Sequence, residues 1–169
     1  MNMKKISALV LVVLLCSSCK WLQDAFIEYT PGLYNDSAFG LYYYCPSAVV
    51  MSTIGSCVYP DTTICFGKLT EAESVGAYGM TGIHSQAKYI ERWFSYFPQD
   101  TISIFLFDEE TVENVPWETV VKEYLVLQRY DLSIEDFKRL DNDIHYPPTP
   151  EMRDIHMWPP YEEAVKMRQ

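Results

Sequence analysis

The sequence predicts an α+β fold, with a small twisted sheet of about four strands and two or three short helices on one face. A β-sandwich with helical connections is the alternative. The length of 169 residues favours one domain. The hydrophobic content of 49% and aromatic content of 15% indicate a packed core rather than disorder. The apolar pattern also changes its period along the chain, which is typical of strands mixed with helices.

The first residues are typical of a bacterial secretory signal. A short basic start precedes an apolar run over residues 6–15. Small residues then directly precede Cys19, as in the lipobox of bacterial lipoproteins, where the cysteine is acylated and becomes the new N-terminus. Cys16 fits less well because it follows two leucines. We therefore expect residues 1–18 to be a lipoprotein signal peptide; the alternative is a plain signal peptide with an incidental cysteine.

Charge restricts the partners of the chain. Acidic residues outnumber basic ones 23 to 13, for a net charge of −10, which repels nucleic-acid phosphates and argues against a nucleic-acid partner. The acidic body also gains nothing from anionic lipid, so the acyl chains on Cys19 must hold the protein at the membrane. We expect a lipid-anchored protein of the cell envelope, at the outer membrane and facing either the periplasm or the surface. The sequence predicts no cofactor.

The first half of the mature chain alternates between predicted strands and loops. Residues 19–33 are expected to form a lipid-anchored tether or a short helix, and residues 34–146 a single globular domain. Aromatic residues 39–45 predict a strand, and residues 62–66 predict a second one. The glycine-rich stretch 67–82 is expected to be a loop.

Helical spacing of apolar residues begins after this loop. It predicts helices over residues 85–97, with Ser85 as the N-cap, and over residues 116–123. The run 101–107 lies between them, and its second half is apolar on both faces, so we expect a central strand there. Residues 124–130 predict a further strand.

The end of the chain carries one clear helix signal and a Pro-rich segment. Ser133 and Asp136 resemble a capping box that opens a short helix. Residues 147–169 form a Pro-rich segment without readable periodicity. We expect Met157 and Trp158 to pack against the domain, because both are costly to leave in water, and the residues after Tyr161 to be loosely held. A free recognition tail is the alternative.

Several short segments resemble those of a group of small lipoproteins. The segments are Asp100-Thr101-Ile102-Ser103-Ile104-Phe105, Phe107-Asp108, Trp117-Glu118, Arg129-Tyr130-Asp131-Leu132-Ser133, Tyr146-Pro147-Pro148 and Met157-Trp158-Pro159-Pro160-Tyr161. Together they are similar to small uncharacterised lipoproteins of gut Bacteroidetes. The resemblance implies a lipoprotein and its compartment. It assigns no activity and no catalytic residue.

Three cysteines follow Cys19, namely Cys45, Cys57 and Cys65. An odd number in an oxidising compartment predicts one disulfide and one free thiol. A Cys45–Cys57 bridge would close a loop of about a dozen residues and stabilise the fold by about 3 kcal/mol. Cys45–Cys65 is the rival pairing, and buried free thiols are the other alternative. A catalytic thiol lacks an evident neighbouring base.

The histidines and acidic residues predict no metal site. His145 and His156 lie in two similar segments, each with Asp-Ile before the histidine and a Pro-Pro pair after it. Their spacing matches no familiar zinc pattern. The acidic residues between 108 and 113 lack the glycine turn of a calcium loop.

Aromatic residues supply the candidate binding groups. Tyr42 and Tyr44 lie on one face of the strand 39–45, and Tyr43 on the other. With Trp158, they could stack on a sugar or contact a protein, unless they fill the core instead.

The sequence therefore predicts a lipid-anchored envelope protein with a non-catalytic binding or structural role, recognising a glycan or a protein. An envelope immunity or inhibitor protein is the alternative, because acidic charge suits a basic effector. An enzyme that depends on a thiol or a histidine is the least supported class.

Overall fold

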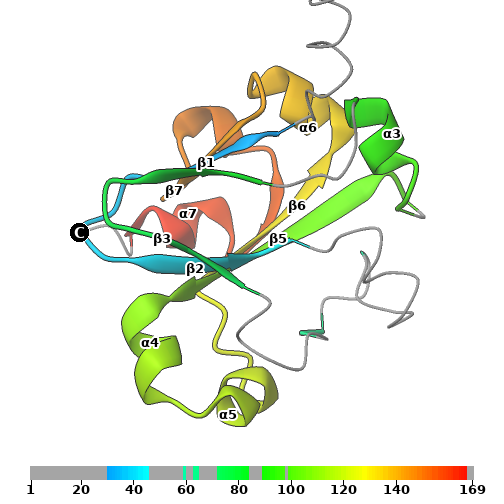
Figure 1. The fold of residues 1–169 in the computed structure, drawn as a ribbon. Coiled ribbons are helices and arrows are strands. Elements are labelled where there is room, and N and C mark those ends of the chain that lie inside the picture. The colour runs from blue at the N-terminus through cyan, green and yellow to red at the C-terminus, as the bar shows by residue number, and fades with distance from the viewer. Residues whose placement is uncertain are drawn as a thin grey trace, which may run out of the picture.

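The computed structural model describes residues 30–45, 59, 63–64, 72–83, 89–97 and 99–166, and shows an α+β fold (Figure 1). The predicted fold class is confirmed. The strands form two sheets, one of three strands and one of five, rather than the single small sheet expected. Within the described residues, no helix has the length and apolar character needed to cross a membrane.

The small sheet has the order β4-β1-β7. Its strands are β1 (Gly32–Asn35), β4 (Met80–Gly82) and β7 (Asp143–Tyr146). β1 pairs antiparallel with β4 and parallel with β7. The small sheet therefore joins an early part of the chain to a late one.

The large sheet has the order β3-β2-β5-β6-β8, and all its neighbours are antiparallel. Its strands are β2 (Leu41–Tyr44), β3 (Glu73–Val75), β5 (Thr101–Asp108), β6 (Gln128–Ser133) and β8 (His156–Trp158). The strand predicted over residues 101–107 is confirmed as β5, in the centre of the sheet. Among the described strands, β8 lies at the edge of the sheet and has a neighbour on one side only.

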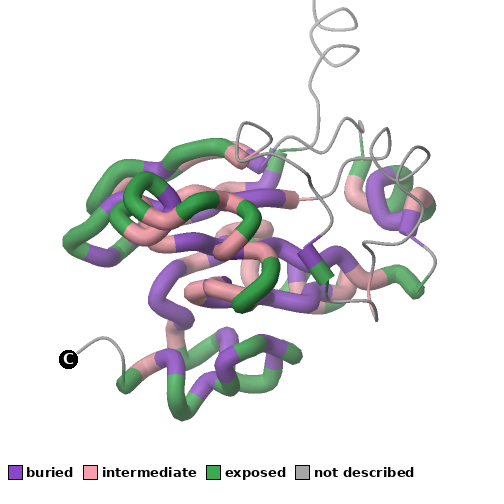
Figure 2. Tube along the Cα trace, turned by 90° about the horizontal axis from the view of Figure 1, so that it is seen from below, coloured by how far each residue is buried: buried purple, intermediate pink, exposed green. Residues whose placement is uncertain are grey.

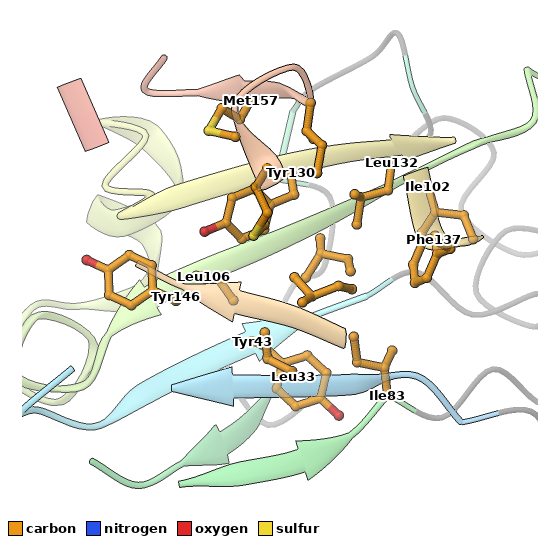
Figure 3. Close-up of a cluster of buried hydrophobic side chains, with 14 of the residues drawn as sticks. Leu33, Tyr43, Ile83, Ile102, Leu106, Tyr130, Leu132, Phe137, Tyr146 and Met157 are labelled. Atoms are coloured by element: carbon orange, nitrogen blue, oxygen red, sulfur yellow. The ribbon is translucent and has the colours of Figure 1, made fainter. Parts of the chain in front are cut away.

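The main core lies between the two sheets (Figure 3). Leu33 and Ile144 of the small sheet and Ile104 and Tyr130 of the large sheet are completely buried in it. Two short helices complete the core, α3 (Ile90–Phe94) and α6 (Ile134–Arg139). Trp93 of α3 contacts Phe137 of α6 with a ring-centroid distance of 5.5 Å.

A second apolar cluster covers the other face of the large sheet. Phe105 and Phe107 of β5 pack there with Val112 of α4 (Glu109–Asn114) and Val120 of α5 (Trp117–Lys122). The helix predicted over residues 116–123 is thus confirmed as α5. Helices contact both clusters. The expectation that the helices lie on one face of the sheet is therefore wrong. Buried stretches of the chain run through the middle of the molecule (Figure 2).

Three local predictions differ from the structure. The stretch 67–82 contains β3 and β4, which have few buried residues and therefore lack the apolar alternation that reveals a strand. The strand predicted over residues 124–130 begins only at Gln128, as β6. Thr63 and Ile64, the described part of the strand predicted over 62–66, have no regular structure.

The helix predicted over residues 85–97 contains α3, which has five residues and begins after Tyr89. Ser85, its predicted N-cap, lies outside the described residues. The buried side chains Trp93, Phe94 and Phe97 follow the predicted apolar spacing.

The C-terminal segment belongs to the fold. It contributes a 3₁₀ helix (Pro150–Met152), the edge strand β8, and helix α7 (Tyr161–Ala164). Met157 is buried in the main core, as predicted, whereas Trp158, which was also expected to pack against the domain, is 41% exposed. The prediction that residues after Tyr161 are loosely held is wrong as far as Ala164, which is buried.

Asn35 links the end of β1 to the start of the large sheet. Its side-chain amide donates to the carbonyl oxygens of Phe39 at 2.7 Å and Gly76 at 3.0 Å. Its side-chain oxygen accepts from the backbone N–H of Ser37 at 3.0 Å, which closes a turn over residues 35–37. Asn35 is completely buried, so its polar atoms need hydrogen-bond partners within the protein, and these bonds supply them.

The predicted capping box is confirmed at the start of α6. The Asp136 N–H donates to Ser133 Oγ at 3.2 Å, and the Ser133 N–H donates to Asp136 Oδ2 at 2.9 Å. Burial opposes ionisation of Asp136, but hydrogen bonds from Ser133 and Arg139 outweigh it and lower the pKa of this carboxyl. The ionised form of Asp136 is therefore favoured by folding.

We expect Asp136→Asn to lower the free energy of unfolding at pH 7 by about 1 kcal/mol, as for a lost cap. Because folding lowers the pKa of Asp136, its contribution is complete above the ordinary value of 3.8 and is lost as pH falls through the folded value. Urea unfolding of both proteins from pH 7 to pH 2 measures this difference. A gap that stays constant over this range would contradict the assignment.

Candidate functional site

Polar side chains form two rows across β5, β6 and β8 on the face turned away from the main core. Ser103 of β5 pairs with Asp131 of β6, which pairs with His156 of β8. Two residues along, Arg129 of β6 pairs with Trp158 of β8. Because side chains alternate along a strand, Tyr130 and Met157 point instead into the main core.

Asp131 is the centre of this arrangement. Its side chain is 0% exposed, and it accepts three hydrogen bonds. Ser103 Oγ lies 2.6 Å from Oδ1, while Arg129 Nε lies 3.1 Å and His156 Nδ1 2.7 Å from Oδ2. A buried carboxylate is costly unless it is paired and hydrogen-bonded in this way. The network therefore fixes the side chains of both Arg129 and His156.

Arg129 extends the network to the turn after α5. Its side chain is 8% exposed, and its guanidinium donates from Nη1 to the Tyr124 hydroxyl at 2.6 Å. The Tyr124 ring meets the Trp158 ring edge-on, with the centroids 5.2 Å apart. We call Tyr124, Arg129, Asp131, His156 and Trp158 the β8 surface.

Tyr124 occupies an unusual backbone position. The Leu125 N–H bonds to the carbonyl of Val120 and the Tyr124 N–H to that of Val121, which is the Schellman pattern at the end of a helix. Tyr124 holds the left-handed residue of this motif, with φ of 52°, where glycine is the usual choice. A tyrosine in this conformation costs about 1 kcal/mol or more. In this conformation the side chain of Tyr124 contacts both Arg129, through its hydroxyl, and Trp158, through its ring.

Three members of the β8 surface reach solvent. Trp158 is 41% exposed, the side chain of His156 is 64% exposed, and Tyr124 is half-buried. Asp131 binds Nδ1 of His156, and no residue in the described part of the chain binds Nε2. The Tyr59 ring stands edge-on to the imidazole, 5.9 Å away between centroids. The surface thus presents an oriented imidazole beside an exposed indole.

Ser103, Asp131 and His156 contain the residue types of a hydrolase triad, but in a different order. In such a triad the histidine lies between the hydroxyl and the carboxylate and accepts the hydroxyl proton. Here Ser103 donates to Asp131, and the aspartate lies between the other two. The imidazole therefore does not activate Ser103. The arrangement instead provides a rigid set of hydrogen-bonding and aromatic groups.

The structure separates the predicted binding aromatics. Trp158 lies at the surface, whereas Tyr44 is buried in the second cluster and cannot present its ring to a ligand. Tyr42 is half-buried against the same cluster. Tyr43 points into the main core, which confirms the predicted alternation. The three candidates do not form one site.

Cys45 has a free thiol in the structure. Burial raises the pKa of this thiol, and the Glu73 carboxylate raises it further, so the reactive thiolate is disfavoured. Cys57, its predicted disulfide partner, lies outside the described residues, as do Cys19 and Cys65. The pairing and the lipidation both remain predictions.

The two similar histidine segments also share a local structure. His145 in β7 and His156 in β8 each place Nδ1 2.7 Å from an aspartate oxygen, in Asp36 and Asp131 respectively. A cis X-Pro bond follows each strand. Among the described residues, no three His, Cys, Asp or Glu side chains are grouped to hold a metal ion.

Tyr124, Arg129 and Asp131 were not among the site residues predicted from the sequence. A signal for two of them is present, because Arg129 and Asp131 are charged residues two apart within a strand that is otherwise buried. This spacing puts both on one face, where they must be paired. Tyr124 has no comparable signal, because its left-handed conformation depends on where α5 ends.

We expect Arg129→Met to lower the free energy of unfolding by about 3–5 kcal/mol, because it leaves Asp131 buried without its cation. Arg129→Met combined with Asp131→Leu should cost less than the two single changes added together. Urea unfolding at pH 7 measures this. Arg153→Met is the matched control, since the Arg153–Glu162 pair is 62% and 67% exposed and is expected to contribute at most about 1 kcal/mol. Equal losses for Arg129→Met and Arg153→Met would contradict the buried pairing.

Comparison with known proteins finds no family model that matches the chain, and no curated protein or solved structure that matches it.

Proposed function

We propose that this chain is a lipid-anchored cell-envelope protein that recognises a glycan through the β8 surface. The observation that carries the proposal is the position of Trp158: its indole is exposed, while the groups around it are fixed by a buried network. A sugar has an apolar face of C–H groups and a rim of polar groups. An exposed indole bordered by hydrogen-bonding side chains complements both.

The surroundings of Trp158 favour a sugar over a protein partner. The centre of a protein interface is an apolar cluster, within about 800 Å² on each partner. Trp158 lies instead among polar side chains, namely those of His156, Arg129 and Tyr124. The patch suits a small ligand with both apolar and polar faces.

The network also prepares the site for binding. Arg129 and Asp131 are almost completely buried, and Asp131 holds the imidazole of His156 in one orientation. Side chains already fixed before binding lose little conformational entropy when a ligand arrives. Weak contacts to a sugar can therefore give useful affinity.

The membrane anchor in the proposal rests on the sequence around Cys19. The basic start, the apolar run and the small residues before Cys19 support it, together with the resemblance to small lipoproteins. A net charge of −10 leaves acyl chains as the means of holding the protein at a membrane.

We expect Trp158→Ala to lower glycan affinity at least tenfold without unfolding the protein, because it removes the stacking surface. Binding of the full-length chain in detergent to a panel of soluble oligosaccharides measures this effect. Tyr89→Ala is the control, because Tyr89 is an exposed aromatic (59%) that is not part of the β8 surface. The proposal fails if no oligosaccharide binds, or if both variants lose affinity equally.

We expect the protein, expressed in a Gram-negative bacterium, to incorporate a palmitate analogue at Cys19 and to partition into detergent. Cys19→Ala should abolish both, whereas Cys16→Ala should retain them. In-gel detection of the label measures incorporation. Labelling that survives Cys19→Ala would refute the anchor at this position.

A further inference from the structure

The polar atoms that the β8 surface leaves open to a ligand are mainly hydrogen-bond donors. Its only carboxylate, Asp131, is occupied on both oxygens: Ser103 donates to Oδ1, and Arg129 and His156 bond to Oδ2. The side chain is also 0% exposed. No carboxylate within the β8 surface can therefore accept a hydrogen bond from a ligand. Because His156 Nδ1 donates to Asp131, the exposed Nε2 of the neutral imidazole is the one acceptor that remains.

The donors that remain lie close together. Arg129 uses Nε for Asp131 and Nη1 for the Tyr124 hydroxyl, and Nη2 has no partner among the described residues. Because the Tyr124 oxygen accepts from Arg129, its own O–H is left to donate. The indole N–H of Trp158 is a further donor, and the Tyr124 and Trp158 rings are in contact.

A donor-rich site selects among sugar groups. A hydroxyl both donates and accepts, and is fully satisfied only where acceptors are also present. A carboxylate only accepts, and an acetamido group accepts at its carbonyl and donates at its single N–H, so either suits a site whose donors outnumber its one acceptor. Charge disfavours the carboxylate of the two. Asp131 already balances the positive charge of Arg129, and the net charge of −10 on the chain repels an anionic ligand. A neutral carbonyl fits the site best.

From the juxtaposition of Trp158, Tyr124 and Arg129 over the buried Asp131, we infer that the glycan contains an N-acetylated amino sugar. This inference rests on the proposed function. The sugar ring stacks on the Trp158 indole, and the acetamido carbonyl accepts from the Tyr124 hydroxyl, which Arg129 orients by donating to its oxygen. With 5.2 Å between the two ring centroids, one sugar residue reaches both groups.

The test compares two trisaccharides with the same β-1,4-linked backbone, N,N′,N″-triacetylchitotriose and cellotriose. They differ only in carrying an acetamido group or a hydroxyl at C2 of each ring. Isothermal titration of the full-length chain in detergent should show about tenfold tighter binding of the acetylated sugar. Trigalacturonic acid is the anionic comparison, and it should bind less tightly than triacetylchitotriose.

Two variants assign the effect to residues. Tyr124→Phe keeps the ring contact with Trp158 and removes the hydroxyl, so it should lower affinity for the acetylated sugar by a severalfold larger factor than affinity for cellotriose. Trp158→Ala should weaken both sugars alike. A thermal unfolding curve confirms that each variant is folded.

The outcomes separate this inference from the proposed function. Equal affinity for the two neutral sugars, tighter binding of trigalacturonic acid, or a preference that survives Tyr124→Phe overturns the acetamido assignment. Absence of binding to all three sugars overturns it too. In each case, binding of another oligosaccharide that depends on Trp158 would leave the proposed function in place. Loss of that dependence would remove both.

Discussion

The position of β8 depends on a single buried carboxylate. Asp131 lies in β6 with no exposure to water, and its charge requires hydrogen bonds from the strands on both sides. Ser103 supplies one from β5 and His156 another from β8, while Arg129 balances the charge from within β6. An edge strand of three residues has few backbone bonds of its own. The carboxylate therefore specifies which segment pairs with β6 and in which register.

The apolar core gives the same strand a second constraint. Met157 points into the core between the sheets, while its neighbours His156 and Trp158 point to the opposite face. A shift of one residue would bury His156 and Trp158 at the core and bring Met157 to Asp131, leaving the carboxylate without a polar partner. Packing and hydrogen bonding thus select the same register. This agreement lets a short C-terminal strand hold an exposed tryptophan in a defined place.

Features set by nearby residues were predictable from the sequence, and features set by distant ones were not. The capping box of Ser133 and Asp136 lies within four residues, and the apolar run of β5 reveals a central strand by itself. The parallel pairing of β1 with β7 joins segments more than a hundred residues apart, which no local pattern encodes. In the site, Trp158 was identified as a large aromatic in a polar segment. Tyr44 was misjudged because its burial depends on how Phe105 and the helices cover that face.

Two features of the β8 surface are hard to explain by stability alone. A glycine in place of Tyr124 would avoid the cost of the left-handed conformation at the end of α5. An apolar pair in place of Arg129 and Asp131 would often be as stable as the buried ion pair or more so. The His145–Asp36 pair has the same 2.7 Å separation between Nδ1 and a carboxylate oxygen as the His156–Asp131 pair. Both of its side chains are partly exposed, so it carries no comparable desolvation cost. Two independent costs therefore converge on the residues that orient His156 and support Trp158. Such local departures from the most stable choice are expected where a surface must present particular groups to a ligand.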